Sequence, residues 1–264
     1  MNYKYKIGFI GAGNMANCIL NGIILNNIVK NNDIILSRAN IPQNNTNNYN
    51  YIIDNNYVLQ NCEYVVLAVK PQVFETIKSQ LSNAKCKVII SIMAGVSSST
   101  IKNLCNDINV VRIMPNTPCM IGEGMSCILK DSAQPQQLDF IKNIFASIGK
   151  IEMVEENQFD AVVSVSGSGP AYVYAFIDAM IKGGINGGLS PETSKILTLQ
   201  TFLGATKMVQ NSEEPISSLI QKVCSKGGTT IQAIDSFKQD NLEQIICNGI
   251  EKCKNRSIEL GAKK

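Results

Sequence analysis

The chain has 264 residues, of which 45% are hydrophobic and 17% charged, and its formal net charge is +3. That length suits one large domain or two smaller ones, and so mild a charge argues against a nucleic-acid-binding protein. The sequence contains no histidine, which excludes Ser-His-Asp and Cys-His catalysis as well as histidine-based zinc sites.

Short apolar runs alternate with helical patterns in the first half of the chain. One helix is expected over Asn14–Leu25, and a second follows Pro71 with apolar residues at helical spacing. The Asn-rich stretch Ile41–Asn50 is expected to be a loop where a second crossover helix would otherwise stand. The predicted strands are Lys6–Ile10, Asp33–Ser37, Tyr64–Val69, Val88–Met93 and Val110–Met114. This alternation predicts an α/β fold of the Rossmann type, a doubly wound parallel sheet.

The second half shows only helical patterns beyond about Gln158. A good start signal is Ser190-Pro191-Glu192, in which an N-cap residue precedes a proline and an acid. Other helices are expected at Gly169–Ile181, Ile216–Val223 and about Leu242–Leu260. We therefore expect a Rossmann domain at residues 1–157 and an all-helical domain at 158–264.

A glycine-rich pattern, G-A-G-N-M-A, directly follows the first predicted strand and opens the first predicted helix. In that context it predicts a dinucleotide site, because the glycines let the backbone approach a pyrophosphate and the helix N-terminus supplies N–H donors. The alternative is a plain glycine turn. The residues assigned to the cofactor here are Gly11, Ala12, Gly13, Asn14 and Met15.

The end of the second predicted strand bears on the choice of cofactor. NAD enzymes usually carry an acid there, whereas this chain has Ser37 and Arg38. A guanidinium and a hydroxyl suit a 2′-phosphate, which favours NADPH while leaving NADH possible. The alternative is that Arg38 is a solvated loop cation. Small residues at the ends of two later strands, Ala68 and Ala94-Gly95, leave room for a nicotinamide ring.

Two further glycine-rich segments lie in the helical half. Ser166–Tyr172 reads S-G-S-G-P-A-Y, and Cys224–Thr230 reads C-S-K-G-G-T-T before a helical run. The second is a candidate anion cradle for a substrate carboxylate, since it offers free N–H groups and the two hydroxyls of Thr229 and Thr230. The alternative, that both segments are capping loops, stays equally open.

Nine cysteines are spread along the chain without any C-x-x-C pair. We therefore expect no metal site, and we interpret the cysteines as small buried apolar residues. The N-terminal residues lack the pattern of a signal peptide, and no apolar run approaches the ~18 residues of a membrane span. A cytoplasmic protein without membrane or nucleic-acid partners is expected.

Taken in order, these segments resemble the pyrroline-5-carboxylate reductase family. The strongest similarity lies in S-G-S-G-P-A-Y and in G-G-T-T-I, and supporting motifs are A-V-K-P at Ala68–Pro71 and M-P-N-T-P at Met114–Pro118. The resemblance implies reduction of 1-pyrroline-5-carboxylate to L-proline with NAD(P)H, the last step of proline synthesis. It also implies a homodimer through the helical domain, and often a larger ring of dimers.

The resemblance also implies roles for individual residues. Thr230 is expected to hydrogen-bond the ring nitrogen as the catalytic group, in a loop that acts with the nicotinamide site of a neighbouring subunit. Lys226 stands where the family usually has proline, which adds charge beside the expected carboxylate. The substrate residues are Ser225, Gly227, Gly228, Thr229 and Thr230, and the remaining cofactor contacts are Ser37, Arg38, Asn55, Ala68, Val69, Lys70, Pro71, Ala94 and Gly95.

Two other classes of function share these features. A β-hydroxyacid dehydrogenase needs a lysine soon after the glycine-rich start of the helical domain, but residues 167–180 contain none and the next is Lys182. A non-catalytic NADPH-binding sensor or scaffold would show a broken substrate loop. The G-G-T-T segment is intact, and Lys226 is the best argument for that alternative.

Overall fold

The computed structural model of the chain describes residues 2–40 and 49–262. The expected loop at Ile41–Asn50 therefore falls outside the described residues, apart from its last two. The chain forms two compact units, one of residues 1–168 with 253–264 and one of residues 169–252.

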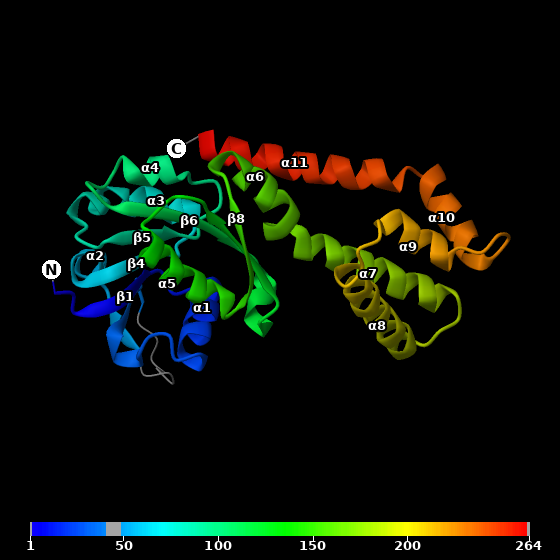
Figure 1. Cartoon of the computed structure of the whole chain (residues 1–264), viewed down its shortest axis with the longest axis horizontal. Helices are drawn as coiled ribbons and strands as arrows, with labels where there is room; N and C mark the ends of the chain where they lie inside the picture. Colours follow the sequence, from blue (N-terminus) through cyan, green and yellow to red (C-terminus); the bar gives the residue numbers. More distant parts are fainter. Residues whose placement is uncertain (1, 41–48, 263–264) are drawn as a thin grey trace. The chain divides into compact units, whose positions relative to one another are not determined.

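The first unit is built on one eight-stranded sheet with the strand order β3-β2-β1-β4-β5-β6-β7-β8 (Figure 1). Neighbouring strands run parallel except β6 and β7, which are antiparallel. The strand order reverses direction between β1 and β4, as in doubly wound dinucleotide-binding folds, so the predicted fold class is confirmed. The strands are β1 (Tyr5–Ile10), β2 (Ile34–Ser37), β3 (Asn50–Ile52), β4 (Cys62–Leu67), β5 (Val88–Ser91), β6 (Asn109–Pro115), β7 (Gly124–Leu129) and β8 (Gly149–Val154).

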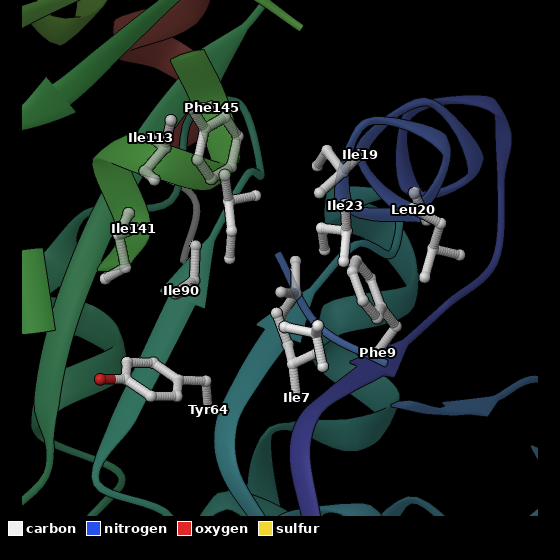
Figure 2. Close-up of a cluster of buried hydrophobic side chains, with 14 of the residues drawn as sticks. Ile7, Phe9, Ile19, Leu20, Ile23, Tyr64, Ile90, Ile113, Ile141 and Phe145 are labelled. Atoms are coloured by element: carbon white, nitrogen blue, oxygen red, sulfur yellow. The ribbon is translucent and has the colours of Figure 1, made fainter. Parts of the chain in front are cut away.

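Helices cover both faces of this sheet because its strands alternate apolar side chains to either side. On one face α1 (Asn14–Leu25) and α5 (Pro135–Ala146) pack over a cluster that includes Ile7, Phe9 and Phe145 (Figure 2). On the other face a second cluster joins the sheet to α2 (Asn55–Asn61), α3 (Pro71–Ile77) and α4 (Ser98–Lys102). Each large side chain buried in this way contributes about 1.5–3 kcal/mol to folding.

The second unit is entirely helical, as the sequence predicts. The N-cap of α8 is Ser190, whose hydroxyl accepts a hydrogen bond from the Thr193 N–H at 3.1 Å. The helices are α7 (Gly169–Asn186), α8 (Pro191–Gln210), α9 (Ile216–Val223), α10 (Thr229–Gln239) and α11 (Leu242–Ala262), the last of which ends within the first unit. No helix in the described part of the chain is both long and apolar enough to cross a membrane.

Residues 169–252, all of which the structure describes, bury no large apolar side chain. Helices α7 and α8 meet through small residues, where the Ser194 hydroxyl donates a hydrogen bond to the Ile181 carbonyl at 2.8 Å. The apolar stripes that mark these helices in the sequence stay exposed, including Phe176, Met180 and Leu203. A helical unit without its own apolar core needs another surface to cover those stripes.

The compact units divide the chain differently from the expected boundary between residues 157 and 158. Residues 158–168 and the end of α11 belong to the first unit, because Ser257 of α11 is buried and its hydroxyl donates to an Asp160 carboxylate oxygen at 2.6 Å. Beside it, Gly95 and Gly261 approach so closely that a Cβ on Gly261 would lie 3.1 Å from the Gly95 carbonyl oxygen. The expectation that an independently folding domain ends at residue 157 stays a prediction.

Glu156→Gln is expected to destabilise the first unit by about 1–3 kcal/mol. The Glu156 carboxylate accepts hydrogen bonds at 2.6 Å from the guanidinium of Arg112 and from the hydroxyl of Ser98. Arg112 is buried, so it would lose its charge partner within the protein. Urea unfolding followed by circular dichroism measures the change. The matched control Glu155→Gln removes an exposed ion pair with Lys130. A loss of stability in this control as large as in Glu156→Gln would contradict the stabilising role given to the Arg112–Glu156 pair.

Candidate active site

The glycine turn between β1 and α1 lies at the carboxyl ends of the parallel strands. Gly11 has a φ of +95°, and a Cβ on it would lie 2.7 Å from the Ala68 carbonyl oxygen. Its N–H donates to the carbonyl of Ser37 at 2.9 Å, and the Ala68 N–H donates to Ile10 at 2.9 Å. The turn thus ties together the ends of β1, β2 and β4.

The N-terminus of α1 is open to a ligand. Its N-cap is Gly13, which has no side chain to cap the helix, and the first N–H groups of a helix lack partners within it. A Cβ on Gly13 would meet nothing within 4 Å. After the half-buried Ala12, the next positions are Asn14, which is exposed, and Met15, which is half-buried. This geometry fits a pyrophosphate approaching the backbone.

At the end of β2 the structure brings together two residues assigned to the cofactor. The hydroxyl of Ser37 donates a hydrogen bond of 2.6 Å to the Asn55 side-chain oxygen, and Asn55 is the first residue of α2. Arg38 follows Ser37 and is half-buried. Among the residues that the structure describes, no carboxylate forms an ion pair with Arg38. Its guanidinium is therefore available for a phosphate.

The segment after β4 continues the same edge. Ala68 and Val69 are half-buried, and a Cβ on Gly11 would lie 3.0 Å from a Val69 methyl group. Lys70 is the exposed N-cap residue of α3 and Pro71 is its first helical residue. Ala68 and Val69 thus lie beside the glycine turn, and the contacts of all four residues with the cofactor stay a prediction.

The segment after β5 is placed differently from its neighbours. Ala94 is half-buried, but Gly95 is fully buried at a φ of +67°. A Cβ on Gly95 would lie 3.4 Å from the Leu260 Cβ and 3.5 Å from the Ser257 carbonyl oxygen. In this chain Gly95 thus packs against α11, and its expected contact with the nicotinamide is left as a proposal.

Asn116 joins two of the motifs that carry the family resemblance, M-P-N-T-P and S-G-S-G-P-A-Y. Its side chain accepts from the Met125 N–H at 2.8 Å and donates to the carbonyl of Ser166 at 3.3 Å. Ser166 lies in a π-helical turn, Val163–Gly167, and such turns are frequent at functional sites. The signal in the sequence was the lone amide between Pro115 and Pro118.

The expected substrate loop lies in the second unit, between α9 and α10. Its turn is closed by a hydrogen bond of 3.0 Å from the Gly228 N–H to the Ser225 carbonyl, with Gly227 at a φ of +73°. Gly228 is the N-cap of α10 and supplies no side-chain cap. Ser225, Lys226 and Thr229 are exposed, whereas Thr230 is half-buried. The free N–H groups at the start of α10 can bind an anion by donating hydrogen bonds to it.

The dinucleotide cradle and the substrate loop belong to different units of one chain. Within the described residues no group of three or more Cys, Asp or Glu side chains is arranged to hold a metal ion. The groups that these two segments offer a ligand are backbone N–H groups, hydroxyls, amides and a few cations.

Comparison with known proteins identifies the class first. Residues 6–95 match the family described as NADP oxidoreductase, coenzyme F420-dependent, and residues 156–260 match pyrroline-5-carboxylate reductase dimerisation. Fold, cradle and these matches define an NAD(P)-dependent oxidoreductase with a helical dimerisation region.

Relatives along the whole chain then identify the family. A pyrroline-5-carboxylate reductase of Synechocystis is 36% identical over 98% of this chain and 99% of its own, and one of Bacillus subtilis is 35% identical over 97% and 95%. The crystal structure of Plasmodium falciparum pyrroline carboxylate reductase with NADP bound matches with a TM-score of 0.88 at 30% identity, covering 98% of this chain and 99% of that one. The chain belongs to the pyrroline-5-carboxylate reductase family.

Proposed function

We propose that this chain reduces 1-pyrroline-5-carboxylate to L-proline, with NADPH as the preferred reductant and NADH as a possible one. The observation that carries the proposal is the presence, in one member of this family, of both an open glycine cradle at β1 and an uncapped N-terminus at α10. The first suits the pyrophosphate of the cofactor and the second suits the carboxylate of the substrate.

The bound nicotinamide supplies a hydride to the carbon of the cyclic C=N bond. The N–H groups at the start of α10, with the hydroxyls of Ser225 and Thr229, hold the substrate carboxylate. Thr230, in the first turn of α10, hydrogen-bonds the ring nitrogen. The carbon of the C=N bond accepts the hydride best when that nitrogen is protonated as an iminium. A hydroxyl is a weak acid, so positioning by the loop supplies most of the rate. A chain without histidine can catalyse this reaction.

Loss of NADPH absorbance in the presence of racemic pyrroline-5-carboxylate tests the activity. We expect rapid turnover, repeated with NADH to give the preference between the cofactors. Tight NADPH binding without turnover, on this imine or on its six-membered homologue, would contradict the proposal and favour a non-catalytic NADPH sensor.

Arg38→Leu is expected to lower the preference for NADPH over NADH by about 10–100-fold, since a charged hydrogen bond is worth about 1.5–3 kcal/mol. The loss should fall on the KM for NADPH, because NADH lacks the 2′-phosphate. The ratio of kcat/KM values for the two cofactors measures it. Lys142→Leu removes an exposed cation of α5 and should leave the ratio unchanged. An unchanged ratio in Arg38→Leu would make Arg38 a solvated loop cation.

We infer a homodimer in which the exposed stripes of α7 and α8 are covered by a second copy. The absence of buried large apolar side chains from residues 169–252 supports it, as does the match of residues 156–260 to a dimerisation family. Native mass spectrometry separates a dimer from a ring of dimers, and a monomer at micromolar concentration would contradict both. Nine free thiols suit a reducing compartment, and we place the protein in the cytoplasm.

A further inference from the structure

Three sulfur atoms converge between α1 and the neighbouring 3-10 helix Thr117–Ile121. Met15 and Cys18 lie three residues apart and so share one face of α1. The Cys119 Sγ lies 3.5 Å from the Met15 Sδ, and Cys18 and Cys119 line the same cavity. Both cysteines are buried, at 5% and 3% exposure. Two thiols and one thioether from two elements therefore lie close together.

A cavity of ≈ 310 Å³ gives access to this sulfur cluster, which we define as Met15, Cys18 and Cys119. Both thiols line the cavity, together with apolar side chains such as Leu25 and Ile121, and none of its lining residues carries a charge. A small ion can therefore reach the thiols. No carboxylate lines the cavity, so a hard cation finds no charged oxygen ligand there.

The chemistry of the three ligands selects a soft ion. Thiolate and thioether sulfur bind Cu(I) in preference to hard divalent ions. With metal–sulfur bonds of about 2.3 Å, two ligands of a trigonal site stand about 4 Å apart. The Cys119–Met15 separation of 3.5 Å is close to that spacing. We propose that Met15, Cys18 and Cys119 form a binding site for one soft monovalent metal ion of the Cu(I) class.

The test is a titration of the full reduced chain with Cu(I) under argon, in competition with the coloured Cu(I) chelator bicinchoninate and without any cofactor. We expect the chain to withdraw one tightly held Cu(I) from the chelator. Cys18→Ala and Cys119→Ala should each weaken that binding at least tenfold, and Met15→Leu severalfold. The matched control is Cys105→Ala, which removes a buried thiol bonded to the Ile101 carbonyl, and it should bind as the wild type does.

X-ray absorption at the copper edge gives an independent readout. Three sulfur neighbours are expected in the wild type and two in Met15→Leu, a variant that keeps the volume of the side chain and so the packing of α1. Wild-type affinity in the Cys18→Ala, Cys119→Ala double variant would overturn the site. Two sulfur neighbours in the wild type would overturn the role of Met15.

Discussion

Gly11→Ala is expected to weaken NADPH binding by about 100-fold or more, the equivalent of about 3 kcal/mol. Gly11 has a φ of +95°, and the added methyl group would lie 2.7 Å from the Ala68 carbonyl oxygen. That clash is with backbone rather than with a flexible side chain, so the ends of β1 and β4 must separate. The turn then no longer presents its N–H groups to the pyrophosphate. Titration of NADPH fluorescence measures the affinity.

A matched control separates the clash from backbone strain. Gly122 also has a positive φ, of +76°, but a Cβ there would meet nothing within 4 Å. Gly122→Ala should therefore cost about 1–3 kcal/mol of stability from strain alone, with NADPH binding intact. Equal NADPH affinity in Gly11→Ala and the wild type would show that the cofactor does not use this turn.

Thr230→Ala is expected to lower kcat/KM for the imine by about 10–100-fold, as for the loss of one hydrogen bond to a charged group. Thr230 is half-buried in the first turn of α10. Thr230 belongs to the second unit and the cradle residues belong to the first, so the affinity for NADPH should stay unchanged. Steady-state kinetics in which the imine and NADPH are both varied measure the two effects separately.

The hydroxyl itself is tested by Thr230→Ser, which restores the hydroxyl group and should recover most of the activity. Thr201→Ala in α8 is the matched control, because that hydroxyl bonds only to the Leu197 carbonyl of its own helix. If Thr230→Ala kept wild-type kcat/KM, the ring nitrogen would have to be held by another group, and the role proposed for Thr230 would fail.

The sequence predicts the centre of the sheet better than its margins. Strands β1, β4, β5 and β6 are rich in buried apolar residues because helices cover both their faces. Strand β8 alternates half-buried and exposed residues, and β7 contains the buried Ser126, so neither has that pattern. Helix α5 was also missed, although Gln134 and Gln137 form a capping box before its apolar face. Strand β3 and helices α2 and α4 are too short to show a period.

The candidate site, like the sheet, can be predicted from the sequence only in part. The glycine turn and the G-G-T-T loop are recognisable because glycine is favoured where φ is positive, as at Gly11 and Gly227. The partnership of Ser37 with Asn55 required a three-dimensional structure, since 18 residues separate them. The same holds for Gly95, whose neighbours in α11 come from the far end of the sequence. Contacts between distant segments leave no local pattern.

The return of α11 to the sheet has a consequence for synthesis of the protein. Residues 253–262 complete the first unit, with Ser257 bonded to Asp160 and Gly261 against Gly95. Residues 169–252 lie between these contacting segments in the sequence, so the ribosome makes all of them before α11 can reach its place. Domains usually fold in order as they emerge from the ribosome. Here the first unit cannot be completed until the helical second unit has been synthesised. Until then the nascent first unit exposes the surface around Gly95 that α11 later covers.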